Sequence, residues 1–362
     1  MKQFETSLKE VISQLDRIDP VRYGKTRNFI NGDVTYLSPY ISRGLISTNY
    51  VAHYFLKKGY AVNDIESFLQ ELAWRDYWQQ IWIVRGDEIN KDLRQSQTRA
   101  DRSGIPKSIV LHETGIEAID IAIQEFYSTG YLHNHVRMYV ASLATNVGRC
   151  AWIEPAKWMY YHLLDGDWAS NALSWQWVCG AKSNKLYFAN QENINKYCLS
   201  DQSGTFLDVE YDRLPEIEVP NALQELERYE LRTELPSLNN MVVNSEEPIF
   251  IYNYYNVDPF WRVEERGNRI LLLEPSVFER YPVSKKCIDF CISLAQENIP
   301  NVQIFVGEFS ELQRMNNSII YFKEHPLNNY VGKEDSRDWM SSVKGEFGSF
   351  FSYWKKVKKE LV

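Results

Sequence analysis

The chain has 362 residues, of which 44% are hydrophobic and 14% are aromatic, so it can bury a large core and most of it is expected to fold. Its formal net charge of −8 argues against a basic coat for nucleic acid over the whole surface, although a local basic groove is compatible with that total. No apolar run approaches the roughly 20 residues that cross a bilayer, and the N-terminal stretch MKQFETSLKEVISQL lacks an apolar signal-peptide core. We therefore expect a cytoplasmic protein of two domains with no membrane contact.

Residues 1–200 are predicted to form an all-helical domain. Apolar residues recur at helical spacing in two segments, namely Ile116, Ile119, Ile123 and Phe126, and then Val136, Tyr139, Val140 and Leu143. Thr114 and Glu117 have the spacing of a capping box before the first segment, and Pro155 suits the first position of a further helix, PAKWMYYHLL. Strand-like runs are scarce in this half, which favours a helical bundle.

Residues 201–247 are acidic and punctuated by proline, which predicts a wrapping connector with one short helix. In residues 248–362, the runs PIFIYNYY, RILLLEP, VQIFVGEF and SIIYFKE have the β-branched and aromatic content of strands. The stretch VSKKCIDFCISLAQE between the second and third runs has amphipathic helical spacing. This order predicts a right-handed crossover and a mostly parallel sheet, hence a small Rossmann-like α/β domain. The final stretch GSFFSYWKKVKKELV is predicted to be a basic amphipathic helix.

The cysteines are predicted to be free and mostly buried, because they form no CxxC pair and no disulfide-framework spacing. They are Cys150, Cys179, Cys198, Cys287 and Cys291. A metal or iron–sulfur site is the alternative, but Cys287 and Cys291 on one helix face supply only two ligands. His133 and His135 flank Asn134 without an acidic or cysteine partner at ligand spacing, so no metal site is expected.

The helical half carries several sequence blocks that together resemble the photolyase and cryptochrome family. TGYLHNHVRMYVASLATN and WIEPAKWMYYHLLDGDWASNALSWQW are similar to its flavin-binding half. RYGKTRNF, TYLSPYISRGLIS and FLQELAWRDYW are similar to three further blocks, in the family's order. The resemblance implies a folded, U-shaped FAD in the helical domain, which absorbs blue light and donates an electron from its reduced anion, while the protein supplies binding, orientation and electrostatics.

The resemblance implies a set of FAD-binding residues, namely Tyr23, Thr35, Leu37, Ser38, Arg137, Asp165, Gly166, Asp167 and Asn171. The hydroxyl groups of Thr35 and Ser38, with backbone donors at a helix start, suit a diphosphate. The alternative is that Ser38 and Pro39 merely cap a helix. Tyr23 would also contact the phosphates, and Val34 stands where the family usually has a further hydroxyl.

Arg137 and Asp165 match a family ion pair beside the isoalloxazine ring of FAD. A buried cation near the ring favours its anionic hydroquinone, because opposite charges stabilise the ionised form. Asp165 would balance Arg137 when the flavin is neutral, and a purely structural salt bridge is the alternative. Asp167 is expected near the pyrimidine edge of the ring. Asn171 matches the position that faces the flavin N5, where asparagine is the photolyase-like choice.

Trp175 matches the flavin-proximal tryptophan of the family's electron-transfer chain, and Trp152 matches the middle one. No tryptophan in residues 92–112 matches the third, surface position. Either a tyrosine or another tryptophan such as Trp158 takes its place, or light-driven reduction of the flavin is slow. Ordinary core packing is the alternative for each of these tryptophans.

The resemblance also implies a set of DNA-binding residues around a flipped-out cyclobutane pyrimidine dimer, namely Arg27, Glu71, Trp74, Arg75, Asn134, Met138 and Trp177. Trp74 and Trp177 would form an aromatic slot for the two fused pyrimidines, and Glu71 and Asn134 would bond to the base edges. The branch that repairs the other ultraviolet lesion has histidines at Asn134 and Met138, which disfavours that activity here. Helical spacing would equally place Glu71 and Trp74 on one face of an ordinary core helix.

Two positions depart from the dimer-repairing pattern. His135 stands where the family has a phosphate-contacting arginine, and Ala189 stands at the arginine of its YFR segment. The cations that remain to compensate are Arg27, Arg75, Lys182 and Lys185. Because each lost phosphate contact weakens binding and flattens its salt dependence, we expect weaker DNA binding or a bias toward single strands.

Family members normally carry an α/β antenna domain before the flavin domain, whereas residues 248–362 resemble part of that domain placed after it. An unrelated α/β appendage is the alternative. No glycine-rich phosphate loop occurs in this segment, and a second, antenna chromophore stays unassigned. The expected fold is thus multidomain, with an all-α FAD-binding domain of photolyase and cryptochrome type followed by a small α/β domain.

The expected function is that of a monomeric deoxyribodipyrimidine photolyase, an FAD-dependent lyase that repairs pyrimidine dimers in DNA by blue-light-driven electron transfer. One alternative is a cryptochrome-like photoreceptor that signals through the flavin redox state. The other is a DNA-binding protein in which FAD is a structural relic.

Overall fold

The computed structural model describes residues 4–183, 185–237, 241–315 and 318–362. Contacts divide the chain into two compact units. Unit 1 contains Val21–Val34 and Val84–Leu231, and unit 2 contains the segment that ends at Pro20, Thr35–Ile83 and Arg232–Val362. The domain boundaries expected at residues 200 and 247 follow the chain linearly, whereas these units cut across them, because several N-terminal helices group with the C-terminal sheet.

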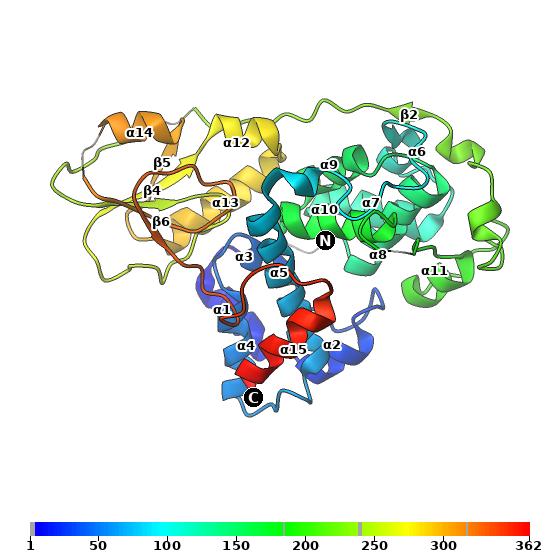
Figure 1. Ribbon diagram of the computed structural model, residues 1–362, viewed down its shortest axis with the longest axis horizontal. Coiled ribbons are helices and arrows are strands. Elements are labelled where there is room, and N and C mark those ends of the chain that lie inside the picture. Colours follow the sequence, from blue (N-terminus) through cyan, green and yellow to red (C-terminus); the bar gives the residue numbers. More distant parts are fainter. Residues whose placement is uncertain (1–3, 184, 238–240, 316–317) are drawn as a thin grey trace. The chain divides into compact units, whose positions relative to one another are not determined.

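Unit 1 is built mainly from helices, most of them drawn from cyan to green in Figure 1. They are α2 (Pro20–Thr26), η1 (Gly86–Asn90), α6 (Lys107–Val110), α7 (Glu117–Thr129), α8 (Asn134–Ser142), η2 (Leu143–Val147), α9 (Ile153–His162), α10 (Trp168–Val178) and α11 (Gln191–Cys198). The connector adds two short turns, η3 (Leu214–Glu216) and η4 (Asn221–Leu223), and a strand β2 (Leu226–Glu227) that pairs with β1 (Ile105–Pro106). The apolar residues predicted at helical spacing are all buried, which confirms that periodicity.

The predicted capping box at Thr114 and Glu117 is wrong. Helix α7 begins at Glu117 with Ile116 at the N-cap position and without a side-chain cap. Instead, the Asp120 carboxylate accepts hydrogen bonds from the Thr114 backbone N–H at 2.9 Å and from the Thr114 hydroxyl at 2.7 Å, and so fixes the turn before the helix. Pro155 is the third residue of α9 rather than the first, but it still lies in the first turn, where its missing N–H costs no helical bond.

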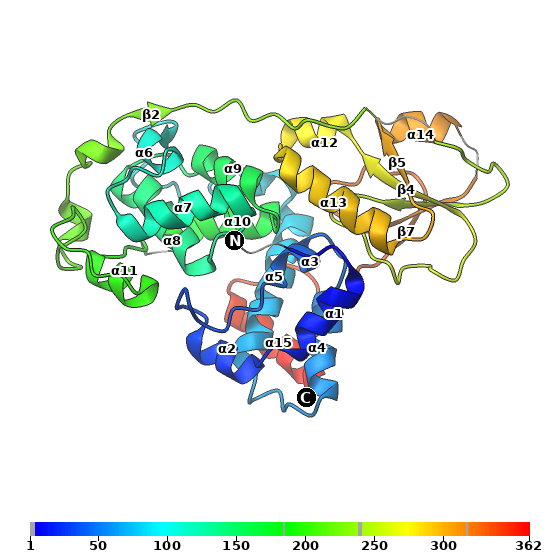
Figure 2. The same cartoon turned by 180° about the vertical axis from the view of Figure 1, so that it is seen from behind.

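Unit 2 contains a five-stranded parallel sheet, drawn from yellow-green to orange in Figures 1 and 2. Its strands are β3 (Ile249–Tyr252), β4 (Asn268–Leu273), β5 (Gln303–Val306), β6 (Ile320–Lys323) and β7 (Lys333–Asp335). The order is β5-β4-β3-β6-β7 and every pairing is parallel, so the predicted parallel sheet is confirmed. The connecting helices are α12 (Pro275–Arg280), α13 (Lys285–Asn298) and α14 (Phe309–Met315).

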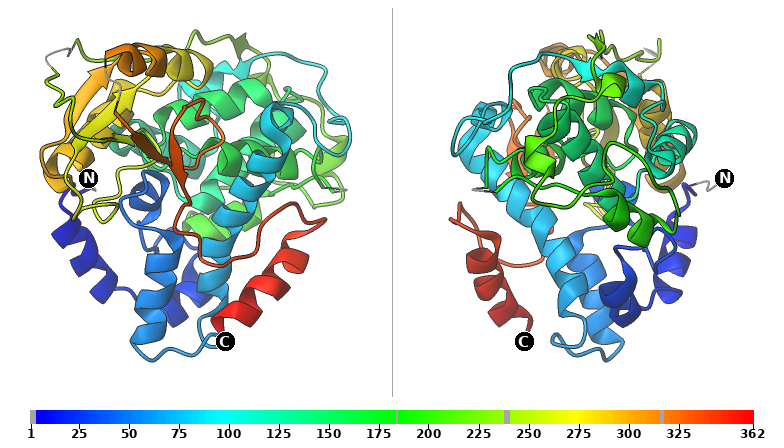
Figure 3. Two further views of the ribbon diagram at one scale, coloured as in Figure 1. Left: turned by 60° about the vertical axis from the view of Figure 1, so that its left-hand side comes forward. Right: turned by 90° about the vertical axis from the view of Figure 1, so that its right-hand side faces the viewer.

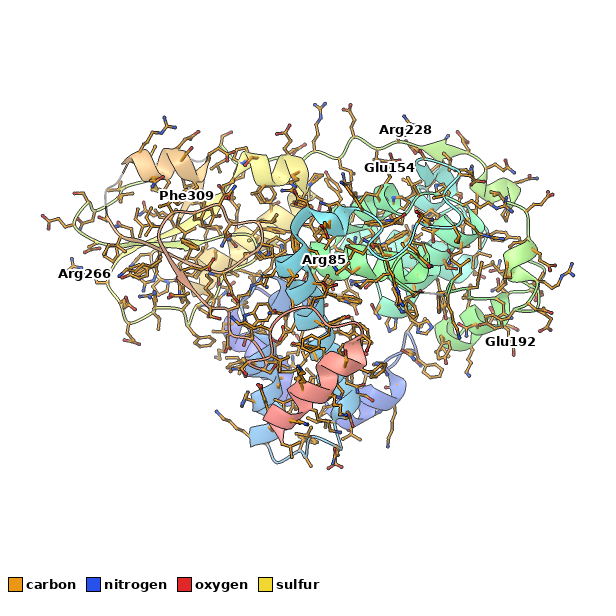
Figure 4. All side chains as sticks on the ribbon, in the orientation of Figure 1. Arg85, Glu154, Glu192, Arg228, Arg266 and Phe309 are labelled. Atoms are coloured by element: carbon orange, nitrogen blue, oxygen red, sulfur yellow. The ribbon has the colours of Figure 1, made fainter. Side chains whose placement is uncertain are left out.

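The sheet packs around an apolar core to which alternate residues of β3, β4 and β6 contribute. Ile249 and Ile251 of β3 and Ile270 and Leu272 of β4 are buried in one cluster with residues that follow β5, as the two-residue period of a strand requires. Phe309 at the start of α14 belongs to the same cluster, and Figure 4 labels it among the crowded side chains around the sheet. The hydrophobic runs predicted from the sequence therefore form the centre of this unit.

Helices from elsewhere in the chain complete unit 2, namely α1 (Leu8–Asp16), α3 (Ser38–Ser42), α4 (Thr48–Lys57), most of α5 (Glu66–Arg85) and α15 (Phe350–Leu361). The segment after α3 is bonded to the segment after β3, since the Val257 N–H donates to the Arg43 carbonyl oxygen at 2.8 Å. The Arg43 guanidinium also lies 3.6 Å from the centre of the Tyr254 ring. Gly44 has a φ of 70°, and a Cβ there would lie 2.8 Å from the Tyr255 carbonyl oxygen, so this approach favours glycine.

The five cysteines are free and buried, as predicted. Among the described residues, no helix combines the length and apolar character needed to span a bilayer.

Asp76 on α5 is a buried carboxylate whose ionisation is expected to affect stability. It accepts hydrogen bonds from the Thr48 hydroxyl and from the Met340 backbone N–H, each at 3.0 Å, and burial raises its pKa to about 6. Because the folded-state pKa lies above the ordinary value of 3.8, the stability that this group contributes is fully present below about pH 4. That contribution is lost as the pH rises through about 6.

We therefore expect Asp76→Asn to gain stability relative to the wild type between about pH 4 and pH 8, by up to about 3 kcal/mol. Urea unfolding of both proteins across this range measures the difference. Asp289→Asn, which loses only an exposed ion pair with Lys285, is the matched control. A stability difference between Asp76→Asn and the wild type that does not vary with pH would contradict the raised pKa.

Candidate functional site

Arg137 and Asp165 form a largely buried ion pair in unit 1. Arg137 lies on α8, and Asp165 lies in the turn between α9 and α10. The Arg137 Nη2 is 3.0 and 2.9 Å from the two Asp165 carboxylate oxygens, and its Nε donates to the Leu132 carbonyl oxygen at 2.8 Å. The Asp165 side chain is 3% exposed and that of Arg137 is 21% exposed, so salt screens this pair less than a surface pair. The predicted ion pair is present, and its position beside a flavin stays a prediction.

The turn that carries Asp165 continues through Gly166 and Asp167. A Cβ on Gly166 would lie 2.9 Å from the Leu163 carbonyl oxygen, so the turn requires glycine where the backbone folds back on itself. Asp167 is the N-cap of α10 and accepts a hydrogen bond from the Ser170 backbone N–H at 3.2 Å. Asp167 therefore stabilises the start of α10, in addition to the cofactor contact predicted for it.

Asn171 on α10 is held by the neighbouring helix. Its side chain donates from Nδ2 to the Ala156 carbonyl oxygen on α9 at 2.8 Å, and the residue is 9% exposed. This bond orients the amide and leaves its Oδ1 atom and the second N–H of Nδ2 for a further partner. Such a group is suited to a ligand that presents both a donor and an acceptor, as a flavin ring does.

Trp152 and Trp175, the predicted electron-transfer tryptophans, are both buried in unit 1. The Trp152 Nε1 donates to an Asp92 carboxylate oxygen at 2.8 Å. Trp158, one candidate for the missing surface tryptophan, is only 1% exposed and donates to the Tyr127 hydroxyl at 3.1 Å. Trp158 is therefore not a surface residue itself, and the half-buried Tyr127 is the more exposed member of that pair.

Unit 1 also contains four of the predicted DNA-binding residues, all exposed or half-buried. Asn134, the first residue of α8, is exposed, and Met138 lies one turn further along the same helix. Trp177 near the end of α10 is 41% exposed, with its ring centroid 5.9 Å from that of Tyr187. Arg27 is half-buried directly after α2. None of these four side chains is fully buried.

The histidines beside Asn134 are packed and uncharged at neutral pH. The His135 ring stacks on Tyr197 with centroids 4.6 Å apart, and the His133 Nδ1 accepts a hydrogen bond from the His135 backbone N–H at 3.2 Å. Burial lowers the pKa of both imidazoles to about 4. A neutral His135 cannot replace the charge of an arginine, and Ala189 is buried. Within the described ranges, no cluster of three or more His, Cys, Asp or Glu side chains could hold a metal ion.

The predicted diphosphate residues do not all belong to one unit. Thr35, Leu37 and Ser38 belong to unit 2, and Tyr23 belongs to unit 1. Ser38 is the first residue of α3 rather than its cap, because Leu37 occupies the N-cap position without a side-chain bond. The Thr35 hydroxyl oxygen accepts from the Leu37 N–H at 3.3 Å. Helix α3 has only five residues, so its dipole contributes little to binding an anion.

Glu71, Trp74 and Arg75 lie on α5 and are half-buried. The Arg75 Nη1 donates to the Ser42 hydroxyl oxygen at 2.5 Å. The Trp74 indole is stacked against Phe350 of α15, with centroids 3.7 Å apart and planes inclined by 9°. Phe350 is absent from the predicted set, because the run GSFFSYW predicts an amphipathic helix without indicating which helix it contacts.

Comparison with known proteins identifies the segment that carries most of these residues. Residues 68–229 match a family model described as the FAD binding domain of DNA photolyase. A deoxyribodipyrimidine photo-lyase of Streptomyces griseus is 36% identical over 154 residues, which are 41% of this chain and 33% of the relative. A cryptochrome DASH of Ostreococcus tauri, described as chloroplastic/mitochondrial, is 29% identical over 224 residues, which are 58% of this chain and 39% of the relative.

A crystal structure of a class III photolyase from Agrobacterium tumefaciens is 26% identical, with a TM-score of 0.45, and the match covers 53% of this chain and 42% of that one. The chain spans about a third to two fifths of the length of these curated relatives. Residues 68–229 are thus similar to the FAD-binding domain of the photolyase and cryptochrome family.

Proposed function

We propose that this protein binds FAD and uses blue light to split cyclobutane pyrimidine dimers in DNA, as a deoxyribodipyrimidine photolyase-type lyase. The observation that carries the proposal is the largely buried ion pair of Arg137 and Asp165, which lies inside the segment that matches the FAD-binding domain. Charged groups are costly to bury unless they are paired and hydrogen-bonded. A guanidinium held in this way can balance negative charge on a ring beside it.

The side chains of unit 1 fit the ring end of FAD. When bound, FAD supplies light absorption and electron transfer. Arg137 would favour the negatively charged form of the ring. Asp165 would hold the guanidinium in place and balance its charge when the ring is neutral. Asn171, oriented by its bond to Ala156, would offer one donor and one acceptor to the ring. The assignment of the diphosphate to the hydroxyl groups of unit 2 rests on the resemblance alone.

The proposed substrate is a pyrimidine dimer flipped out of the DNA stack. Trp177 and Trp74 are proposed to stack on the fused bases, and Asn134 and Glu71 to bond to their edges. The exposure of Asn134 and Trp177 supports these roles. The neutral His135 argues for few phosphate contacts. A single strand suits such a protein, because its bases are already unpaired and stacking supplies much of the affinity.

We expect single-stranded dimer DNA to bind more tightly than duplex dimer DNA, with a shallow dependence on salt. Each phosphate contact contributes a slope of about 0.9 for duplex DNA, or about 0.7 for single strands, to the plot of log affinity against log salt. Replacing Arg27 by glutamine should lower that slope by about one contact. Titration of wild type and Arg27→Gln at several salt concentrations measures this, and a steep slope with a duplex preference would contradict the expectation.

Repair itself is tested with fully reduced flavin, blue light and dimer-containing oligonucleotides, both single- and double-stranded. We predict light-dependent loss of dimers that does not occur in the dark. No loss of dimers in either kind of strand would reject repair. That outcome would favour the second candidate function, a cryptochrome-like photoreceptor, for which the net charge of −8 and the neutral His135 are the supporting observations.

A further inference from the structure

The C-terminal helix α15 places an aromatic ring flat against Trp74. The ring centroids of Phe350 and Trp74 are 3.7 Å apart and their planes are inclined by 9°. Tyr77 and Trp78 approach the same indole at 5.6 and 5.0 Å with inclined planes. Trp74 nevertheless stays half-buried. Phe350 thus covers one face of the indole. The part of the ring that stays exposed lies outside that covered face.

Helix α15 is firmly attached to α5, beside which it runs in Figure 3. Phe350, Tyr353 and Trp354 are each less than 5% exposed. At the other end of the contact, the Glu66 carboxylate accepts hydrogen bonds from the Trp354 Nε1 at 2.8 Å and from the Lys358 Nζ at 2.7 Å. Burial of three aromatic side chains makes displacement of this helix costly.

The segment before α15 is hydrogen-bonded to buried side chains of α5. The Gln79 side-chain oxygen accepts from the Arg337 guanidinium at 2.7 Å, and that of Gln80 accepts from the Gly345 backbone N–H at 2.9 Å. The Tyr77 hydroxyl donates to the backbone oxygen of Phe347 at 3.0 Å, immediately before the turn into α15. These bonds fix the position of Phe350 at the start of α15. They therefore disfavour a movement of α15 that would uncover Trp74.

We infer that Phe350 is a positioning residue of the dimer-binding site, which holds the Trp74 indole in one plane so that its exposed part can stack on a pyrimidine. The inference rests on the proposed function, because it takes Trp74 as one of the two stacking residues. A ring that is already ordered loses less side-chain freedom when the base binds, and binding is correspondingly tighter. The C-terminal helix therefore completes the site, although the family match ends at residue 229.

The test is binding of a single-stranded oligonucleotide with one cyclobutane dimer, measured in the dark with the full-length protein against the undamaged oligonucleotide. Phe350→Leu keeps an apolar side chain but removes the flat ring, and should weaken the preference for the dimer by about three- to tenfold. Phe350→Tyr keeps the ring and should restore that preference. Phe351→Ala changes the 68% exposed neighbour and should have no effect.

A second measurement reports on the surroundings of the Trp74 ring. The indole N–H resonance of Trp74, assigned by its loss in Trp74→Phe, should shift in Phe350→Leu and stay in place in Phe351→Ala, because only the former removes the stacked ring. Phe350→Met serves the same purpose if the leucine variant does not fold. If the folded Leu or Met variant binds the dimer as tightly as the wild type, or more tightly, the inference is overturned. Tighter binding would show that Phe350 obstructs the site. If Trp74→Ala also keeps the dimer preference, the proposed substrate contact fails instead.

Discussion

Replacing Arg137 by leucine is expected to lower the free energy of unfolding by about 3–5 kcal/mol and to leave the purified protein with little FAD. The substitution removes the guanidinium from the Asp165 carboxylate, which is 3% exposed, so the buried charge loses its closest cation. It also removes the charge proposed to stabilise the reduced ring. Urea unfolding measures the first effect, and the ratio of flavin to protein after reconstitution measures the second.

Arg213→Leu is the matched control, because it removes an exposed arginine of unit 1 that pairs only at the surface with Glu216. It should change stability by less than about 1 kcal/mol and leave FAD uptake intact. The double variant Arg137→Leu with Asp165→Leu should recover part of the stability but not the flavin, since it removes both buried charges. Full FAD uptake by folded Arg137→Leu would contradict the role proposed for this cation.

Replacing Trp175 by phenylalanine is expected to reduce light-driven reduction of oxidised FAD to background, while the protein still binds the flavin. Phenylalanine fills much of the same buried volume, but its ring is far harder to oxidise than indole. Dimer repair by the variant should recover once the flavin is reduced chemically, because Trp175 is proposed only to refill the electron. Absorption changes of the flavin under continuous blue light, with an external reductant present, measure the effect.

Trp168→Phe is the control for this experiment, since Trp168 is a fully buried tryptophan at the start of the same helix. It loses the hydrogen bond from Trp168 Nε1 to the Asn90 side-chain oxygen at 2.7 Å, which should cost about 1 kcal/mol of stability. Photoreduction should survive. If Trp175→Phe reduces its flavin as fast as the wild type does, another donor serves the flavin and the assignment of Trp175 fails.

The elements of the fold that carry a hydrophobic pattern could be predicted, and those without one could not. The period of apolar residues gave α7 and α8, and four β-branched runs gave β3 to β6. Strand β7 (Lys333–Asp335) is short, polar and partly exposed, and it is a strand only because its backbone pairs with β6. The grouping of N-terminal helices with the sheet could not be predicted either, because the hydrogen bond between Arg43 and Val257 joins distant parts of the chain.

Only part of the candidate site could be predicted from the sequence. The pair of Arg137 and Asp165 followed from a sequence motif, because both residues lie in blocks that resemble one family. The packing of His135 against Tyr197, which keeps the imidazole neutral, depends on tertiary contacts that no motif records. The stack of Phe350 on Trp74 is likewise a contact between remote segments, and amphipathic spacing identifies only that Phe350 faces some core.

FAD binding by this chain underlies every role proposed for the site, and an absorption spectrum of the purified protein tests it most directly. We predict flavin absorption at a stoichiometric ratio to protein, either as isolated or after reconstitution, and its loss in Arg137→Leu but not in Arg213→Leu. Wild-type protein that is folded by circular dichroism and still takes up no FAD would contradict the account.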